Sequence, residues 1–222
     1  MNVAASCKRA QIVLFDGFDL LDVVGPYEIL WAGGRASGGA LHVELVSLEG
    51  PRDVPSGANG TSVAATAALD AQNADLIVLP GAAGRTVGDG PDTIPILLGR
   101  AVESGLAAAV GPALARADAV VATVCGGSLI LAMAGFLAGR NAVTHHLGME
   151  VLAATGARPV SARVVDDGNL VMAAGVTSGL DLGIYLLERL LGPRIAHAVE
   201  TLFAYERRGT VWRSAGREAV EW

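Results

Sequence analysis

Short apolar runs rich in β-branched residues recur through the first half of the chain and predict buried strands. They span 11–15, 41–48, 75–80 and 119–124, and each is bounded by Gly, Pro or Asp. Runs that are apolar at every position, rather than at alternate positions, are typical of strands covered by helices on both faces. The pattern therefore predicts a mainly parallel central sheet.

The segments between these runs are long enough for crossover helices. Helices are expected over 21–32 and 91–117, with the second segment split into two helices by Gly105, Gly111 and Pro112. Strands that alternate with helices indicate βαβ units. Further along, the pattern predicts a helix at 128–137, a strand at 142–144, a helix at 148–154, a hairpin at 160–174 turning at 167–169, and closing helices at 178–191 and 194–207.

Composition narrows the domain organisation and the class of partner. A chain of 222 residues that is 52% hydrophobic can bury one large core, so we expect a single domain over 11–207, a flexible N-terminus over 1–10 and a C-terminal extension over 208–222. The net charge is -6, and no basic run exceeds the pair Arg207-Arg208, which predicts neither a nucleic-acid nor a membrane partner. A small molecule is the expected partner.

The location is predicted from what the sequence lacks. No apolar run reaches the roughly 18 residues that a bilayer span needs, and no secretory signal is recognisable. Cys7 and Cys125 are the two cysteines, and their spacing fits neither a disulfide framework nor a zinc motif. We expect a cytoplasmic protein without a metal or other cofactor.

Cys125 carries the sharpest chemical signal. The run 119–124 leads directly into Cys125, then into Gly126 and Gly127, and then into an apolar helix. This is the layout of a nucleophile elbow, which places a side chain at the carboxyl edge of the sheet. A following helix would lower the pKa of the thiol, so that it reacts readily near neutral pH. The alternative is that Cys125 is a small buried apolar side chain.

Asp22 is the second unusual residue, because it is surrounded by Leu and Val. A poorly hydrated carboxyl would have a raised pKa, which suits a group that acts as both general acid and general base. Its position fits equally well an N-cap of a helix that begins near Val23, and the two roles are compatible. Asp16 and Asp19 are expected to be turn residues.

Other small and polar residues are predicted to lie at the same sheet edge. Gly81 and Ala82 follow the run 75–80, and their backbone N–H groups, with that of Gly126, would form an oxyanion pocket. Thr144 and His145 end a short strand nearby, where the histidine would support the site. Adjacent residues such as His145 and His146 point to opposite faces of a strand, which argues against a shared metal.

Four segments together resemble the ThiJ/PfpI superfamily. They are 20–26 (LLDVVGP), 77–81 (IVLPG), 124–137 (VCGGSLILAMAGFL) and the pair Thr144-His145. Further segments at 139–140, 167–170 and 175–181 make the chain similar to the isocyanide hydratase branch. The resemblance implies a flavodoxin-like three-layer α/β sandwich with a mainly parallel sheet and a nucleophile elbow, and a homodimer.

The resemblance also implies roles for the residues. Cys125 would be the nucleophile and Asp22 the acid and base of an enzyme that adds water to an isocyanide through a cysteine thioimidate, giving an N-substituted formamide. The amides of Ala82 and Gly126 would hold developing charge, and His145 corresponds to a family histidine near the cysteine. One departure is Gly126, where this branch usually has Thr, and the segment 84–116 also looks longer than in relatives.

Other functions of the same superfamily are also compatible with the sequence. One is a ligand or redox sensor, because a reactive thiol can be oxidised reversibly. Related sensors carry a DNA-binding module, for which 209–222 is too short. Another is a glyoxalase-like or amidase-like enzyme, which Asp22 in place of the usual Glu disfavours and Gly126 leaves open.

Overall fold

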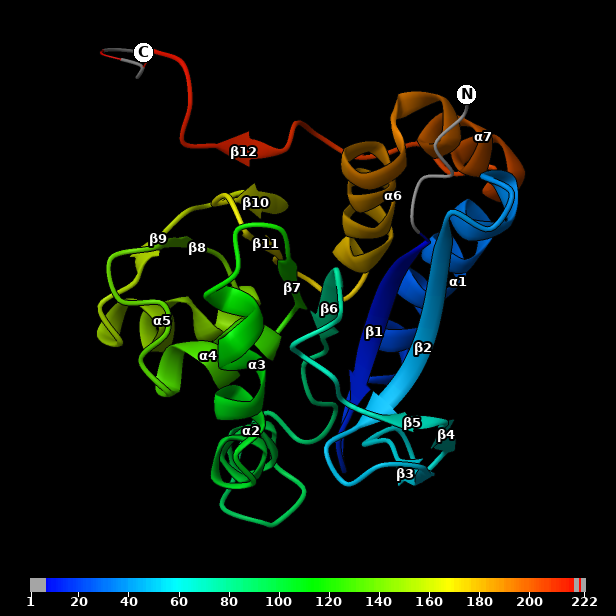
Figure 1. Cartoon of the computed structure of the whole chain (residues 1–222). Coiled ribbons are helices and arrows are strands. Elements are labelled where there is room, and N and C mark those ends of the chain that lie inside the picture. Colours follow the sequence, from blue (N-terminus) through cyan, green and yellow to red (C-terminus); the bar gives the residue numbers. More distant parts are fainter. Residues whose placement is uncertain (1–6, 218–219, 221–222) are drawn as a thin grey trace.

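The computed structural model describes residues 7–217 and 220, and an eight-stranded sheet runs through its centre (Figure 1). Neighbouring strands are parallel except β10 and β11, which are antiparallel. In spatial order the strands are β12 (Trp212–Arg213), β10 (Val164–Asp166), β11 (Leu170–Ala173), β7 (Val120–Val124), β6 (Leu76–Leu79), β1 (Lys8–Leu14), β2 (Leu41–Ser47) and β5 (Ala67–Ala68).

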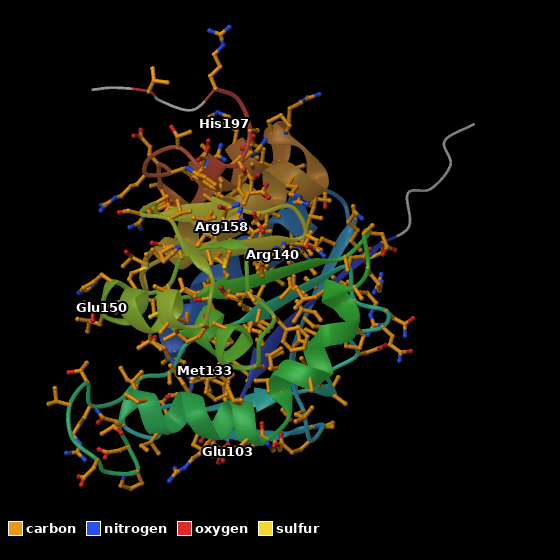
Figure 2. The ribbon with its side chains drawn as sticks, turned by 90° about the vertical axis from the view of Figure 1, so that its left-hand side faces the viewer. Glu103, Met133, Arg140, Glu150, Arg158 and His197 are labelled. Atoms are coloured by element: carbon orange, nitrogen blue, oxygen red, sulfur yellow. The ribbon has the colours of Figure 1, made fainter. Side chains whose placement is uncertain are left out.

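Helices cover both faces of this sheet. One layer consists of α1 (Leu20–Ala36), α6 (Ser178–Leu191) and α7 (Pro193–Phe203), which pack against one another. The other layer consists of α2 (Ile94–Glu103), α3 (Leu106–Leu114), α4 (Gly127–Met133) and α5 (Met149–Ala154). Figure 2 faces this second layer and labels Glu103, Met133 and Glu150 on it. The predicted three-layer α/β sandwich with a mainly parallel sheet is confirmed.

The central strands are buried because they are apolar at every position. All residues of β6 and β7 are buried, as expected for strands with helices on both sides. They pair with each other, β6 also pairs with β1, and β7 also pairs with β11. The carboxyl ends of β1, β6 and β7 therefore meet at one edge of the sheet, and the candidate site lies there.

The predicted split of 91–117 into two helices is confirmed, and the break lies at Gly105 alone. Gly105 separates α2 from α3 through its positive φ of 85°, whereas Gly111 and Pro112 lie within α3. Pro112 is close to the end of this short helix, so few backbone hydrogen bonds are affected by its missing N–H. The hairpin of β3 (Arg52–Pro55) and β4 (Ser62–Ala65) was not predicted, nor were β5, β9 (Arg158–Pro159) and β12, because these short strands lack an apolar run.

Several other predicted elements are present with shifted ends. The hairpin at 160–174 is formed by β10 and β11, and α6 spans the predicted 178–191. The predicted helix at 128–137 is α4, which ends at Met133, and the predicted strand at 142–144 is β8 (Asn141–Ala142). A 3-10 helix, His146–Gly148, precedes α5.

The terminal segments join the sheet more closely than the sequence suggested. β1 begins at Lys8, inside the stretch expected to be flexible, of which 1–6 lie outside the described residues. In the C-terminal extension β12 pairs with β10, and the Arg213 guanidinium lies 5.2 Å from the centre of the Tyr185 ring.

Within the described residues, no single helix has the length and apolar character needed to cross a membrane. The pair α2 and α3 passes that test only together, by length and composition, and is bent by 67° at its break.

Candidate active site

Cys125 occupies a strained turn between β7 and α4. Its φ is 53°, in the left-handed region that residues other than glycine seldom adopt. Its backbone N–H donates to the carbonyl oxygen of Ala173 at 3.0 Å, which ties the turn to β11. The strand, turn and helix of the predicted nucleophile elbow are therefore present, and the strain is held by neighbouring structure.

Gly127 makes this sharp turn possible. A Cβ added at Gly127 would lie 2.3 Å from the carbonyl oxygen of Leu79, a distance that no side chain tolerates. Gly126 itself has an ordinary helical φ of -68°. The close approach of β6 therefore requires glycine at Gly127.

Thr144 holds the other side of the elbow. Its buried hydroxyl donates to the carbonyl oxygen of Cys125 at 2.9 Å, and the Ser128 hydroxyl approaches the same oxygen at 3.4 Å. Thr144 thus positions Cys125 by binding the backbone carbonyl of the cysteine.

We expect Thr144→Val to lower the free energy of unfolding by about 1 kcal/mol and to reduce turnover, because it removes this hydrogen bond at nearly constant volume. The matched control is Thr155→Val, which removes a hydroxyl bond to the carbonyl of Leu152 at the end of α5. Thermal melting and turnover are measured on both variants. Equal turnover in the two would show that Thr144 does not position Cys125.

Asp22 is fully buried at the start of α1. Its Oδ2 accepts a hydrogen bond from the Gly81 N–H at 2.8 Å, whereas its Oδ1 is buried without a protein partner. The alternative role as helix cap is wrong. The helix begins at Leu20, and its N-cap is Asp19, which accepts from the N–H groups of Leu21 and Asp22.

Burial is the main cause that raises the pKa of Asp22 well above its ordinary value, and the negative charge of Asp19 adds to it. The Gly81 N–H acts in the opposite direction but is weaker. The predicted direction for this carboxyl is therefore confirmed. Asp19 was predicted to be only a turn residue, but its charge also acts on the site.

The predicted low pKa of the Cys125 thiol is wrong. Burial, followed by the charge of Asp22, raises its pKa to about 12, although the Gly126 N–H opposes the shift. Only 8% of Cys125 is exposed, so the loss of hydration outweighs the helix dipole. The pKa values of Asp22 and Cys125 are both raised, so burial favours the protonated form of each group.

We now expect iodoacetamide to modify Cys125 slowly near neutral pH, at least about tenfold more slowly than an exposed cysteine, because thiolate is the reactive form. Cys7 is exposed and serves as the internal reference. Peptide mapping over a pH series measures both rates in one sample. Faster labelling of Cys125 than of Cys7 at neutral pH would contradict the raised pKa.

The residues predicted to form the oxyanion pocket lie close together, but their backbone groups make different contacts. The Gly81 N–H donates a hydrogen bond to Asp22 Oδ2, and its predicted role as a charge-binding donor stays a prediction. A Cβ at Gly81 would lie 2.7 Å from the Gly126 nitrogen and 3.0 Å from Asp22 Oδ2, which shows how closely these groups converge. Ala82 is buried and forms a β-bridge with Phe18. Their proposed contacts with substrate stay predictions.

His145 contacts Leu147 and His146, which follow it in the chain. Its Nδ1 accepts from the Leu147 N–H at 3.3 Å, which caps the 3-10 helix, and its ring lies 4.1 Å from that of His146. Burial lowers the pKa of His145, and His146 adds to that effect. Among the described residues, no cluster of three or more His, Cys, Asp and Glu side chains could hold a metal ion.

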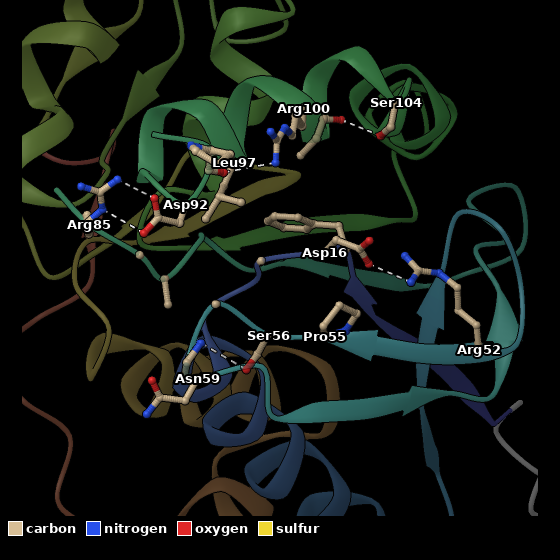
Figure 3. Close-up of a pocket in the computed structure, with 18 of the residues that line it drawn as sticks. Asp16, Arg52, Pro55, Ser56, Asn59, Arg85, Asp92, Leu97, Arg100 and Ser104 are labelled. Atoms are coloured by element: carbon tan, nitrogen blue, oxygen red, sulfur yellow. Dashed lines mark hydrogen bonds and ion pairs between the residues drawn. The ribbon is translucent and has the colours of Figure 1, made fainter. Parts of the chain in front are cut away.

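A cavity of about 870 Å³ lies next to the site (Figure 3). Arg52 pairs with Asp16 and Arg85 with Asp92 along its wall. Neither Cys125 nor Asp22 lines it, so the cavity is a neighbour of the reacting groups and not their enclosure.

Leu98 is a site residue that the sequence analysis missed. It belongs to the segment 84–116, whose role could not be predicted, and it is buried on α2. Its Cδ1 lies 3.1 Å from the position that a Cβ on Gly126 would take. An amphipathic helix over 94–103 was the available signal, but the pattern does not show which apolar residue faces the elbow.

Comparisons with known proteins agree with this architecture. The model of the DJ-1/PfpI family matches residues 8–189. The isonitrile hydratase of Pseudomonas putida is 32% identical over 87% of this chain and 76% of that protein. Protein DJ-1 homolog A of Arabidopsis thaliana is 28% identical over 90% of this chain and 47% of that protein.

Solved structures show the same fold. A ThiJ/PfpI family protein from Pseudomonas syringae superposes with a TM-score of 0.75 at 27% identity, covering 94% of this chain and 79% of that one. DJ-1beta of Drosophila melanogaster superposes with a TM-score of 0.69 at 21% identity, covering 90% and 98%. Its sequence and its fold, with the nucleophile elbow at Cys125, both show that this chain belongs to the DJ-1/PfpI family.

Proposed function

We propose that this protein is an isocyanide hydratase, which adds water to R-N≡C and releases the formamide R-NH-CHO. The observation that carries the proposal is the buried pair of Cys125 and Asp22, in which Asp22 Oδ1 has no protein partner. A buried, unpaired carboxyl oxygen is costly unless it serves a ligand or a proton. The similarity to a protein described as isonitrile hydratase supports the same chemistry.

In the first half-reaction the pair adds its S–H bond across the terminal carbon of the isocyanide. Asp22 gives its proton to that carbon, the sulfur of Cys125 bonds to the same carbon, and the thiol proton passes to Asp22. The product is the thioimidate R-N=CH-S-Cys125. Because the thiol loses its proton only as the new bond forms, a raised resting pKa is compatible with this step.

In the second half-reaction water completes the product. Its oxygen bonds to the thioimidate carbon while a proton reaches the nitrogen, with Asp22 as the relay. The carbon–sulfur bond then breaks, the remaining hydroxyl proton returns to sulfur, and the formamide leaves. One isocyanide and one water give one formamide, and the steps need no cofactor.

Incubation of the reduced protein with cyclohexyl isocyanide tests the proposal. We expect the N-cyclohexylformamide to accumulate over many turnovers and not to form with the protein omitted. Absence of product from folded protein whose Cys125 thiol is shown to be reduced would contradict the proposed reaction.

The alternative of a redox sensor is less well supported. Such a sensor needs an accessible thiolate, whereas Cys125 is buried and the same burial raises its pKa to about 12. The homodimer and the cytoplasmic location stay predictions.

A further inference from the structure

Leu98 fills the space that a side chain at Gly126 would occupy. The distance from Leu98 Cδ1 to the position of a Cβ on Gly126 is 3.1 Å, and from Cδ2 it is 3.6 Å. Both contacts come from the end of one side chain on α2, a helix that packs against α4. The glycine and the leucine therefore form one complementary contact next to the nucleophile.

This contact lies beside the backbone N–H of Gly126, which influences the pKa of the Cys125 thiol. The Gly126 N–H opposes the effect that burial has on the pKa of the Cys125 thiol. Leu98 is 3% exposed, so it covers this side of the elbow with hydrocarbon. A reagent that approaches the sulfur near Gly126 meets an apolar side chain and not water.

From this contact we infer that Leu98 is a specificity-determining residue, which limits the size of the substrate beside Gly126 and favours compact, apolar R groups. The inference rests on the proposed function for its substrate class. The steric part concerns only access to Cys125 and holds for any reagent that attacks the sulfur.

The neighbouring residue Leu97 provides a matched control. It is also a buried leucine on α2, but its Cδ2 lies 2.6 Å from the Cβ position of Gly17 and its Cδ1 lies 3.2 Å from that of Gly84. It lines the adjacent cavity instead of covering Gly126. Truncation of Leu97 and of Leu98 loosens the same helix, but only the second opens the space beside the elbow.

Alkylation of Cys125 tests the steric part without relying on turnover. In a Cys7→Ser background, each variant is treated with iodoacetamide and with its bulkier N-phenyl amide at about pH 9, where more thiolate forms. We expect Leu98→Ala to raise the rate ratio of bulky to small reagent by about tenfold, and Leu98→Val to raise it less. Leu97→Ala should leave the ratio unchanged while lowering the melting temperature comparably.

Turnover of a small and a bulky isocyanide by the same variants tests the substrate part. Leu98→Ala should shift the ratio of kcat/KM toward the bulky substrate, in the same direction as the alkylation ratio. An unchanged alkylation ratio in Leu98→Ala, or an equal change in Leu97→Ala, would overturn the inference. If no variant hydrates an isocyanide but the alkylation ratio shifts as expected, the proposed function fails and the steric role of Leu98 stands.

Discussion

Cys125→Ser is expected to reduce formamide production by at least about a thousandfold, because the hydroxyl is a much weaker nucleophile than the thiol of the native residue. Ser is slightly smaller than Cys, and the positive φ of 53° is imposed by the surrounding turn in both proteins. The melting temperature should therefore stay near that of the wild type. Product formation and thermal melting are measured on one preparation.

Cys7→Ser is the control for this prediction. Cys7 is exposed, so its loss changes the number of thiols without touching the site. We expect its turnover to equal that of the wild type. Formamide production by Cys125→Ser at a rate close to that of the Cys7 variant would rule out a cysteine nucleophile at Cys125.

Asp22→Asn is expected to reduce turnover by at least about a hundredfold, the usual contribution of a general acid or base. Asn keeps the shape of the carboxyl and still accepts the hydrogen bond of the Gly81 N–H, but it cannot carry the proton. Because Asp19 and not Asp22 caps α1, the substitution leaves the helix start intact. The variant should therefore fold normally, which separates the chemical role from a structural one.

The same variant has a predicted pH dependence of stability. Burial raises the pKa of Asp22 in the folded protein above the unfolded value near 3.8, so ionisation of Asp22 opposes folding. The stability that the protonated carboxyl contributes is fully present below the unfolded pKa and is lost as the pH rises through the folded pKa. Relative to wild type, Asp22→Asn should gain stability as the pH rises from the unfolded to the folded pKa, and above that range the difference should stay constant.

Denaturant unfolding of wild type and Asp22→Asn across this pH range measures the difference. The Asn side chain places an amide N–H₂ where Oδ1 was, so a constant cost is added at every pH. The slope of the stability difference with pH, and not its absolute value, is therefore the readout. A slope of the opposite sign, or retained turnover, would mean that another group carries the proton.

The central sheet was predicted well from the sequence because its central strands are continuous apolar runs. β6 and β7 are continuous apolar runs, and the turn at 167–169 placed the hairpin of β10 and β11 correctly. The strands β3 and β4 were missed because each has only four residues, which is too short for a regular pattern of buried and exposed positions to be recognised. Pairing of such strands depends on contacts between distant parts of the chain, which a local pattern does not contain.

At the site, residue identities were easier to predict than their electrostatics. The elbow at Cys125 follows from a strand that ends in Cys-Gly-Gly, and the structure places Asp22 near it, across Gly81 from Gly126. The sign of the thiol pKa was missed because a local view counts the helix dipole but not the burial or the charge of Asp22. Leu98 was missed because its position above Gly126 is a tertiary contact.

The central claim is that the isocyanide carbon becomes bonded to the sulfur of Cys125 during turnover. Acid quenching at short times, followed by mass spectrometry of the intact protein and of its peptides, measures this bond directly. We predict an adduct with the mass of one whole isocyanide on the Cys125 peptide, which disappears when the substrate is consumed. Rapid formamide production with no adduct on Cys125 at any quench time, or with the adduct on another residue, would contradict the account.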